Sequence, residues 1–200
     1  MKLSRVCSIL TGYTARGRLV SAAAGGIPVI QLGDMTTGRI VAKQLMHVQL
    51  GDVQDRHLAR SGDVLFRSRG ARNTALVVDE SLPEPALAVL PLMILRPKQD
   101  IVSAEYLEWA INHPQTQRFF DSVASGTKLR MVSRASLEHL DLDIPDIEAQ
   151  RKIVTLNALA EREQDLSIRI AGMRKELTSR ILGEYAKHPR RAAATERITK

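Results

Sequence analysis

The chain has 200 residues, a formal net charge of +7, 44% hydrophobic residues and a single cysteine. This length suffices for one substantial domain plus an appendage, and one cysteine excludes an internal disulfide and a thiolate metal cluster. No stretch approaches the roughly 20 apolar residues of a membrane span, and no export signal opens the sequence, so we expect a cytoplasmic protein without a membrane partner.

The positive charge is unevenly distributed. Residues 1–150 contain 17 basic and 16 acidic residues, whereas residues 151–200 contain 12 basic and 6 acidic residues. The net charge favours a polyanionic partner such as DNA. Within residues 1–150, affinity for DNA would have to come from local clusters of arginine.

The first 100 residues predict short β-strands separated by turns, because β-branched and apolar runs alternate with glycine, proline and acidic residues. Strands are expected at residues 29–32, 64–66, 75–78, 87–90 and 92–95. Pro91 separates the last two strands and cannot donate to a β-ladder, so it marks an edge or a bulge.

Helices are expected after residue 103. An apolar face with helical spacing runs from there to Pro114, which ends this helix and suits the first turn of a second one. Ser133 can cap a short helix that runs to Leu140. Residues 140–144 alternate apolar and acidic side chains with a period of two, which predicts a strand that ends at Pro145.

Residues 147–186 contain no proline and repeat apolar side chains at spacings of three and four, which predicts one long helix. Glu163 interrupts a seam of heptad positions that otherwise contains only apolar residues: Leu156, Leu159, Leu166, Ile170, Met173 and Leu177. A helix of about 40 residues would be roughly 60 Å long, more than a domain of this size can cover. We therefore expect the seam to pair with another helix; the alternative is a core helix that lies on its own domain.

Several short motifs occur along the chain in a characteristic order. The most specific is Leu-x-x-Leu-x-Leu-x-Ile-Pro from Leu137, followed by an acidic link and then by Gln150-Arg151-Lys152-Ile153-Val154. The earlier motifs are Val6-Cys7-Ser8-Ile9-Leu10-Thr11-Gly12, Gly26-Ile27-Pro28 with Gly33-Asp34, Gly62-Asp63-Val64-Leu65 with Gly70, Ile94-Leu95-Arg96-Pro97, Tyr106-Leu107 and Ser125-Gly126-Thr127. This order resembles the specificity subunits of type I restriction-modification enzymes from about Leu3 to Leu182.

The resemblance implies an α+β fold in which a β-rich target-recognition domain (residues 1–145) precedes one long coiled-coil helix (146–186). It also implies a short helix that opens the domain from Val6 and leads to Gly12. Residues 187–200 are expected to form a disordered basic tail. Such subunits are non-catalytic: each recognition domain reads one half of a split target in double-stranded DNA, and the long helices set the spacing. They also hold the methyltransferase subunits of the complex, with the restriction subunit as a further candidate partner. The implied role is DNA methylation and phage defence.

The chain departs from the family pattern in two ways. The family usually has two recognition domains and two long helices in one polypeptide, whereas this sequence contains one of each. It therefore resembles a half-subunit, which would pair with a second copy as a homodimer or with a different half-subunit. Asp146 and Ala149 stand where the family prefers a proline and a glutamate.

Arginine suits the reading of bases because its planar fork matches the acceptors of guanine, while Lys, Arg and backbone amides hold phosphates. The candidate DNA-binding residues form three groups: Arg67, Arg69 and Arg72; Lys128, Arg130 and Arg134; and Tyr13, Arg16 and Arg18. The alternative for each group is an ordinary solvent-exposed loop, because contact residues of this kind lie on variable loops.

No cofactor, metal site or catalytic residue is expected. None of the five histidines pairs with a cysteine or a second histidine at ligand spacing. Cys7 is expected to be a small core residue, and Asp63 is read as a turn former although it could suggest a nuclease. Two alternatives stay open: a scaffold or regulatory partner of the methyltransferase without sequence-specific DNA binding, and a small stand-alone nuclease.

Overall fold

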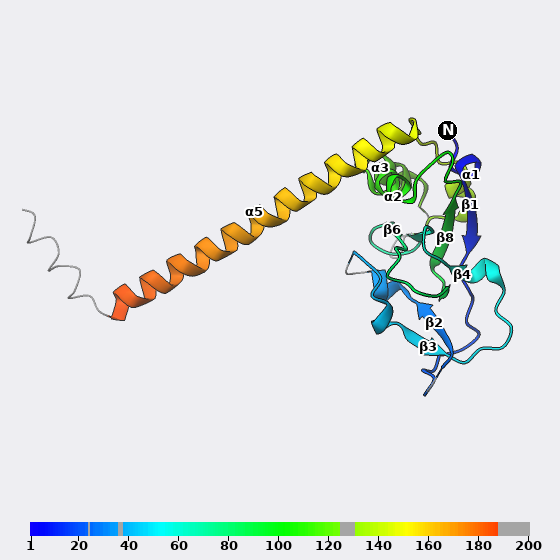
Figure 1. The fold of residues 1–200 in the computed structure, drawn as a ribbon, viewed down its shortest axis with the longest axis horizontal. Helices are drawn as coiled ribbons and strands as arrows, with labels where there is room; N and C mark the ends of the chain where they lie inside the picture. The colour runs from blue at the N-terminus through cyan, green and yellow to red at the C-terminus, as the bar shows by residue number, and fades with distance from the viewer. Residues whose placement is uncertain (24, 36–37, 125–130, 188–200) are drawn as a thin grey trace, which may run out of the picture. The chain divides into compact units, whose positions relative to one another are not determined.

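The structure is a computed structural model that describes residues 1–23, 25–35, 38–124 and 131–187. Contacts divide the chain into two units, with the boundary between Val154 and Thr155. The first unit contains two β-sheets and short helices, and the second contains most of one long helix (Figure 1). The α+β fold predicted from the sequence, with its long C-terminal helix, is confirmed.

The first sheet, called sheet 1 below, is antiparallel throughout. Its strands lie in the order β1 (Cys7–Thr11), β8 (Leu92–Pro97), β5 (Val64–Arg67) and β6 (Ala75–Val77). Thr11 pairs with Met93, and Arg67 pairs with Leu92. The segments that follow β1 and β5 therefore leave sheet 1 at the same end, where β8 begins; we call this the Arg67 end.

The second sheet, called sheet 2, is mixed. Its strands lie in the order β3 (Met46–Val48), β2 (Ile27–Ile30), β7 (Ala86–Ala88) and β4 (Leu58–Ala59), with three 3₁₀ helices, η1 (Leu32–Met35), η2 (Ala42–Gln44) and η3 (Asp55–His57), between strands. The β2–β7 pair is parallel and the other two pairs are antiparallel. A turn at residues 89–91, with a cis bond before Pro91, leads from β7 in sheet 2 to β8 in sheet 1.

Sheet 1 is buried on both faces, which explains its continuous apolar runs. Val64 and Phe66 of β5 belong to the core under the helices, whereas Leu65 between them faces the core shared with sheet 2. Likewise Leu95 of β8 faces the helices and Ile94 faces sheet 2. All five side chains are fully buried.

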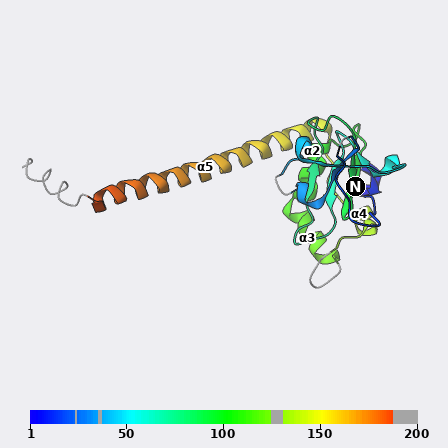
Figure 2. The same ribbon diagram turned by 90° about the horizontal axis from the view of Figure 1, so that it is seen from below.

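Four helices of the first unit are short. They are α1 (Leu3–Val6), α2 (Ala104–Asn112), α3 (Pro114–Val123) and α4 (Arg134–Glu138). Ser103 caps α2 by accepting the Tyr106 N–H (3.1 Å), and Ser133 caps α4 by accepting the Ser136 N–H (3.0 Å). Both helix starts, and the role of Pro114 in the first turn of α3, are as predicted. Helix α2 packs on β5, β6 and β8, and Figure 2 shows the first unit from a second direction.

Two local predictions are wrong. The segment 140–144 is not a strand, although Leu140 and Leu142 are buried and Asp141 is exposed as the alternation requires. Its β-pairing is a single bridge between Asp141 and Lys2, because α1 begins directly afterwards and leaves no longer partner. The helix expected to open the chain is confined to α1, and the following residues form β1 instead.

Helix α5 (Ile147–Lys187) runs for 41 residues without a break. Its first two turns belong to the globular unit, where the Asp146 carboxylate accepts the Ala149 N–H (2.8 Å) and Ile153 packs against the core. The predicted division into residues 1–145, 146–186 and 187–200 stays a prediction, and residues 188–200 lie outside the described residues. Among the described helices, none is long and apolar enough to cross a membrane.

Candidate nucleic-acid interface and pairing helix

The loop that contains the predicted arginine cluster connects β5 to β6 at the Arg67 end of sheet 1. Ser68 binds the turn at residues 89–91 twice, because both its backbone N–H (3.1 Å) and its hydroxyl (2.6 Å) donate to the Pro91 carbonyl. The loop is therefore fixed against the connection between the two sheets. Ser68 itself is buried.

Tyr13 binds the same turn through backbone hydrogen bonds. Its N–H donates to the Ala88 carbonyl (2.7 Å) and its carbonyl accepts the Leu90 N–H (3.0 Å). The preceding Gly12 has no room for a side chain, because a Cβ there would lie 2.5 Å from the Leu92 carbonyl oxygen. The ring of Tyr13 lies nearly perpendicular to that of His57, at 80°, with 5.8 Å between the ring centroids.

The segment before α4 reaches the same loop. Arg69 and Met131 form an antiparallel bridge, and the Val132 N–H donates to the Ser68 carbonyl (2.9 Å). Arg134, the first residue of α4, is thereby brought near the arginine loop, but its Nε donates to Glu138 Oε1 (2.8 Å). The predicted residues Lys128 and Arg130 lie outside the described residues.

The three arginines of the loop differ in what surrounds them. Arg67 is half-buried, and its Nε donates to the Arg69 carbonyl (3.1 Å), so its side chain folds over its own loop. Gly70 makes room for it: its φ is +140°, and a Cβ there would lie 2.5 Å from Arg67 Nη2. The side chains of Arg69 and Arg72 are exposed and have no hydrogen bond or ion pair to the described residues.

The structure thus brings members of the three predicted groups to one end of sheet 1: Tyr13, the arginines of the loop 67–73, and Arg134, which follows the segment 131–133. Arg16 and Arg18 are exposed in the chain that follows Tyr13, and no described contact brings them to the arginine loop. Two features that join these segments, the turn at 89–91 and Ser68, could not be identified from the sequence. The sequence signal is weak, because most of the joining hydrogen bonds are between backbone groups, and all of them connect positions far apart in the sequence.

The acidic residue that could suggest a nuclease has a structural role. The Asp63 carboxylate is buried and accepts two hydrogen bonds of 2.8 Å from Arg96 and one of 2.9 Å from the Arg60 N–H. The hydrogen bond to Asp63 raises the pKa of Arg96 above its ordinary value, so the guanidinium stays charged. In the part of the chain that the structure describes, no group of three or more His, Cys, Asp or Glu residues could hold a metal ion.

The predicted seam of α5 is exposed along the helix. Its six apolar residues have the following exposed fractions: Leu156 67%, Leu159 59%, Leu166 44%, Ile170 49%, Met173 69% and Leu177 59%. Ile181 and Tyr185 extend the same side at spacings of four and are also exposed. The seam from Leu156 to Tyr185 is about 45 Å long at the usual helical rise. This is far more apolar surface than single exposed residues would explain.

Known proteins resemble the chain in sequence. No protein-family model matches it. The type I restriction enzyme HindI specificity subunit of Haemophilus influenzae is 26% identical over 145 residues, which cover 68% of this chain and 31% of the relative. The putative type I restriction enzyme MjaX specificity subunit of Methanocaldococcus jannaschii is 22% identical over 138 residues, which cover 66% of this chain and 32% of the relative. In sequence, the chain is similar to type I restriction enzyme specificity subunits.

The chain shares its fold with solved structures of S subunits. The HsdS subunit from Thermoanaerobacter tengcongensis aligns with a TM-score of 0.60 and 19% identity over 81% of this chain and 36% of its own. The type I restriction-modification S subunit from M. genitalium aligns with a TM-score of 0.55 and 12% identity over 84% of this chain and 40% of its own. The chain spans about a third of the length of the curated relatives it matches.

Proposed function

We propose that this chain is a half-size specificity subunit of a type I restriction-modification system that recognises a specific sequence in double-stranded DNA. The observation on which the proposal rests is that Tyr13, the arginine loop and the segment 131–134 are joined at the Arg67 end of sheet 1. This arrangement puts exposed guanidinium groups on a fixed loop, and a fixed loop is what base reading requires.

The arginine loop suits a nucleic acid for reasons of charge and geometry. Residues 67–74 contain three arginines and no acidic residue. Arg69 and Arg72 are free to bind phosphates or guanine edges, whereas Arg67 supports the shape of the loop. We therefore propose Arg69 and Arg72 as the contacting pair and Arg67 as a residue that positions them. Tyr13, Arg16, Arg18, Lys128, Arg130 and Arg134 stay candidate contacts.

Helix α5 would supply the second half of the recognition unit. An exposed apolar seam is most simply covered by an identical seam, because a two-fold axis presents the same surface on both partners. Burying a leucine-sized side chain stabilises a complex by about 1.5–3 kcal/mol. A homodimer would hold two recognition domains at a fixed separation and read a two-part, palindromic target, and pairing with another half-subunit would read an asymmetric one.

The chain itself would do no bond chemistry. Its proposed partners are the methyltransferase subunits that it docks on the DNA, and the restriction subunit as a further candidate. Methylation and cleavage would then belong to those subunits, and the specificity subunit would act beside the DNA in the cytoplasm. The rival function, a scaffold without sequence-specific binding, rests on the nearly neutral charge of residues 1–150.

A selection from random DNA duplexes separates the two functions. The full chain, at a concentration where its oligomeric state has been measured by light scattering, is incubated with a duplex library and bound DNA is sequenced after several rounds. The proposal predicts enrichment of a motif in two parts with a fixed spacer. A selected pool without any motif would instead support the scaffold, and the same selection with the Arg69→Ala/Arg72→Ala variant serves as the control.

A further inference from the structure

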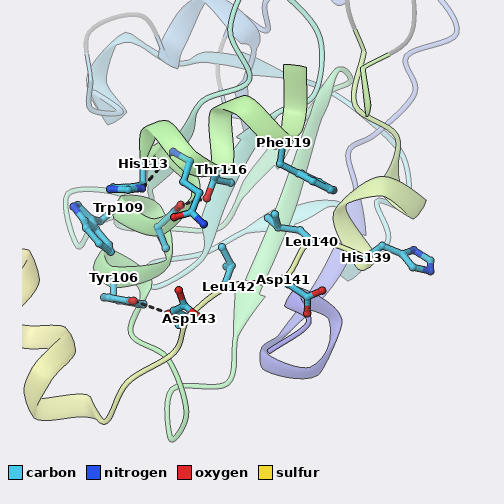
Figure 3. A pocket seen from close by; sticks show the side chains of 12 residues that line it. Tyr106, Trp109, His113, Thr116, Phe119, His139, Leu140, Asp141, Leu142 and Asp143 are labelled. Carbon is cyan, nitrogen blue, oxygen red and sulfur yellow. Dashed lines mark hydrogen bonds between the residues drawn. The ribbon is translucent and has the colours of Figure 1, made fainter. Parts of the chain in front are cut away.

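A surface pocket of about 370 Å³ lies between α2, α3 and the segment 139–143 (Figure 3). This segment hydrogen-bonds to residues 1–3, which precede β1. The arginine loop follows β5 and lies where β1 ends, so the pocket is located at the opposite end of sheet 1. The proposed DNA contacts therefore do not use it.

Three rings line one side of this pocket. Tyr106, Trp109 and His113 follow one another at helical spacing along α2 and its C-terminus, with 5.3 Å and 5.1 Å between neighbouring ring centroids. Figure 3 shows them in a row, with Asp143 beside Tyr106. The Tyr106 hydroxyl donates to the Asp143 carbonyl (2.7 Å), which fixes the ring against the facing segment. Burial, and to a lesser extent the charge of Asp143, raises the pKa of Tyr106, so this donor stays protonated.

The pocket is acidic. Asp141 and Asp143 are exposed in its lining, and neither carboxylate has a hydrogen bond or ion pair to the described residues. Lys2 pairs with Asp141 through the backbone, but no ion pair joins their side chains. The lining contains no lysine or arginine. Aromatic faces and free carboxylates both attract cations, and a guanidinium satisfies both because it stacks on a ring and donates in its own plane.

We propose that this pocket binds an arginine side chain presented by a partner protein. A nucleic acid is disfavoured as the occupant because the two carboxylates repel phosphates. Free arginine is the alternative occupant, and it differs from an arginine within a polypeptide by its α-ammonium and its α-carboxylate. The inference does not depend on the proposed DNA recognition, because the pocket and the arginine loop share no residue.

The chain contains its own probe, because Trp109 is the single tryptophan of the sequence. The full-length protein is titrated with N-acetyl-arginine methylamide, N-acetyl-citrulline methylamide and free arginine at constant ionic strength, and tryptophan emission is recorded. Citrulline has the shape of arginine without its charge. We expect a saturable change with the blocked arginine and no saturable change with citrulline. Free arginine that binds as tightly as the blocked form would overturn the assignment of the occupant to a partner protein.

Two variants show whether the response comes from the pocket. Asp141→Asn/Asp143→Asn should weaken binding of the blocked arginine at least about threefold, whereas Asp52→Asn, which removes an exposed carboxylate outside the pocket, should not. Equal responses to arginine and citrulline would overturn the proposal. So would the absence of a saturable response, or a loss of binding in Asp52→Asn as large as in the double variant. DNA selection with the double variant should be unchanged, which separates this test from that of DNA recognition.

Discussion

Gln150 Oε1 accepts a hydrogen bond of 2.9 Å from the N–H of Ser103, the residue that caps α2. Its amide Nε2 also donates to the carbonyls of Ile101 (2.9 Å) and Pro145 (2.8 Å). One fully buried side chain of α5 thus satisfies three backbone groups from two other segments of the globular unit. The amide is suited to this because it both donates and accepts.

Replacing this amide should destabilise the globular unit. Gln150→Leu keeps a similar volume but leaves one N–H and two carbonyls without their partner, so we expect the free energy of unfolding to fall by about 3 kcal/mol. Urea unfolding followed by Trp109 fluorescence measures it. Gln164→Leu, an exposed position of the same helix, should change it by less than about 0.5 kcal/mol. Equal stability of the two variants would show that the three bonds add nothing.

The ion pair between Asp63 and Arg96 should also be important for stability, because it links the two sheets. Arg96 belongs to β8, and its Nη2 donates to the Leu58 carbonyl in β4 (3.1 Å) as well as to Asp63. Asp63→Asn leaves Arg96 partly buried without its counter-charge, at a cost of about 3 kcal/mol. The control is Asp55→Asn, whose pair with Arg60 is largely exposed and should contribute less than about 1 kcal/mol. The urea unfolding midpoints of the two variants, compared with that of the wild-type protein, test this prediction.

The sequence predicted the regular elements well where a local pattern determines them. The helix start after Ser103, the cap at Ser133, the break at Pro114 and the long helix α5 all follow from signals within a few residues. The segment 140–144 shows the limit of such signals. Its alternation correctly indicates which side chains are buried, but a strand also needs a partner, and the residues that pair with it are at the other end of the sequence.

The candidate interface could be predicted only in part for the same reason. The arginine loop stands out by composition, but its position depends on Ser68, which binds the Pro91 carbonyl 23 residues away. The different environments of Arg67 and Arg69 depend on the positive φ of Gly70 and could not be deduced from residue types. The pocket beside Trp109 was missed entirely, although its rings have helical spacing, because that pattern equally describes a buried face.

Loss of the exposed arginines should weaken DNA binding. We expect Arg69→Ala and Arg72→Ala each to lower affinity for the selected duplex about 5- to 150-fold, the effect of about 1–3 kcal/mol per base-reading contact. If one of these arginines contacts a phosphate, its loss would instead weaken binding to all duplexes alike and reduce the salt dependence of binding. Arg5→Ala makes the same change in charge on α1, away from the Arg67 end, and should have little effect in the same mobility-shift assay. Comparable losses in all three variants would remove the loop from the binding site.

Cys7 should make stability depend on pH in the alkaline range. Burial raises the pKa of this thiol to about 12, with a smaller opposing effect of Lys98, from 9.0 in the unfolded chain. Above pH 9 the unfolded state therefore loses a proton that the folded state keeps, and stability falls as pH rises toward 12. Relative to Cys7→Ala, the wild-type protein should lose stability between pH 9 and 11 in urea unfolding experiments. If the free energy of unfolding of the two proteins changed with pH in the same way, this burial of the thiol would be contradicted.

The seam of α5 should determine the oligomeric state. Leu166→Lys places a charge in the middle of the seam, whereas Ile168→Lys adds the same charge two residues later, about 200° around the helix. Because a symmetric pair loses both leucine contacts, we expect Leu166→Lys to raise the dissociation constant at least about 100-fold, and Ile168→Lys to leave it nearly unchanged. Sedimentation of the full-length proteins over a range of concentrations measures both values. If both variants dissociate alike, pairing does not follow this seam, and if the wild-type chain is monomeric at micromolar concentration, the seam is not covered by a second copy.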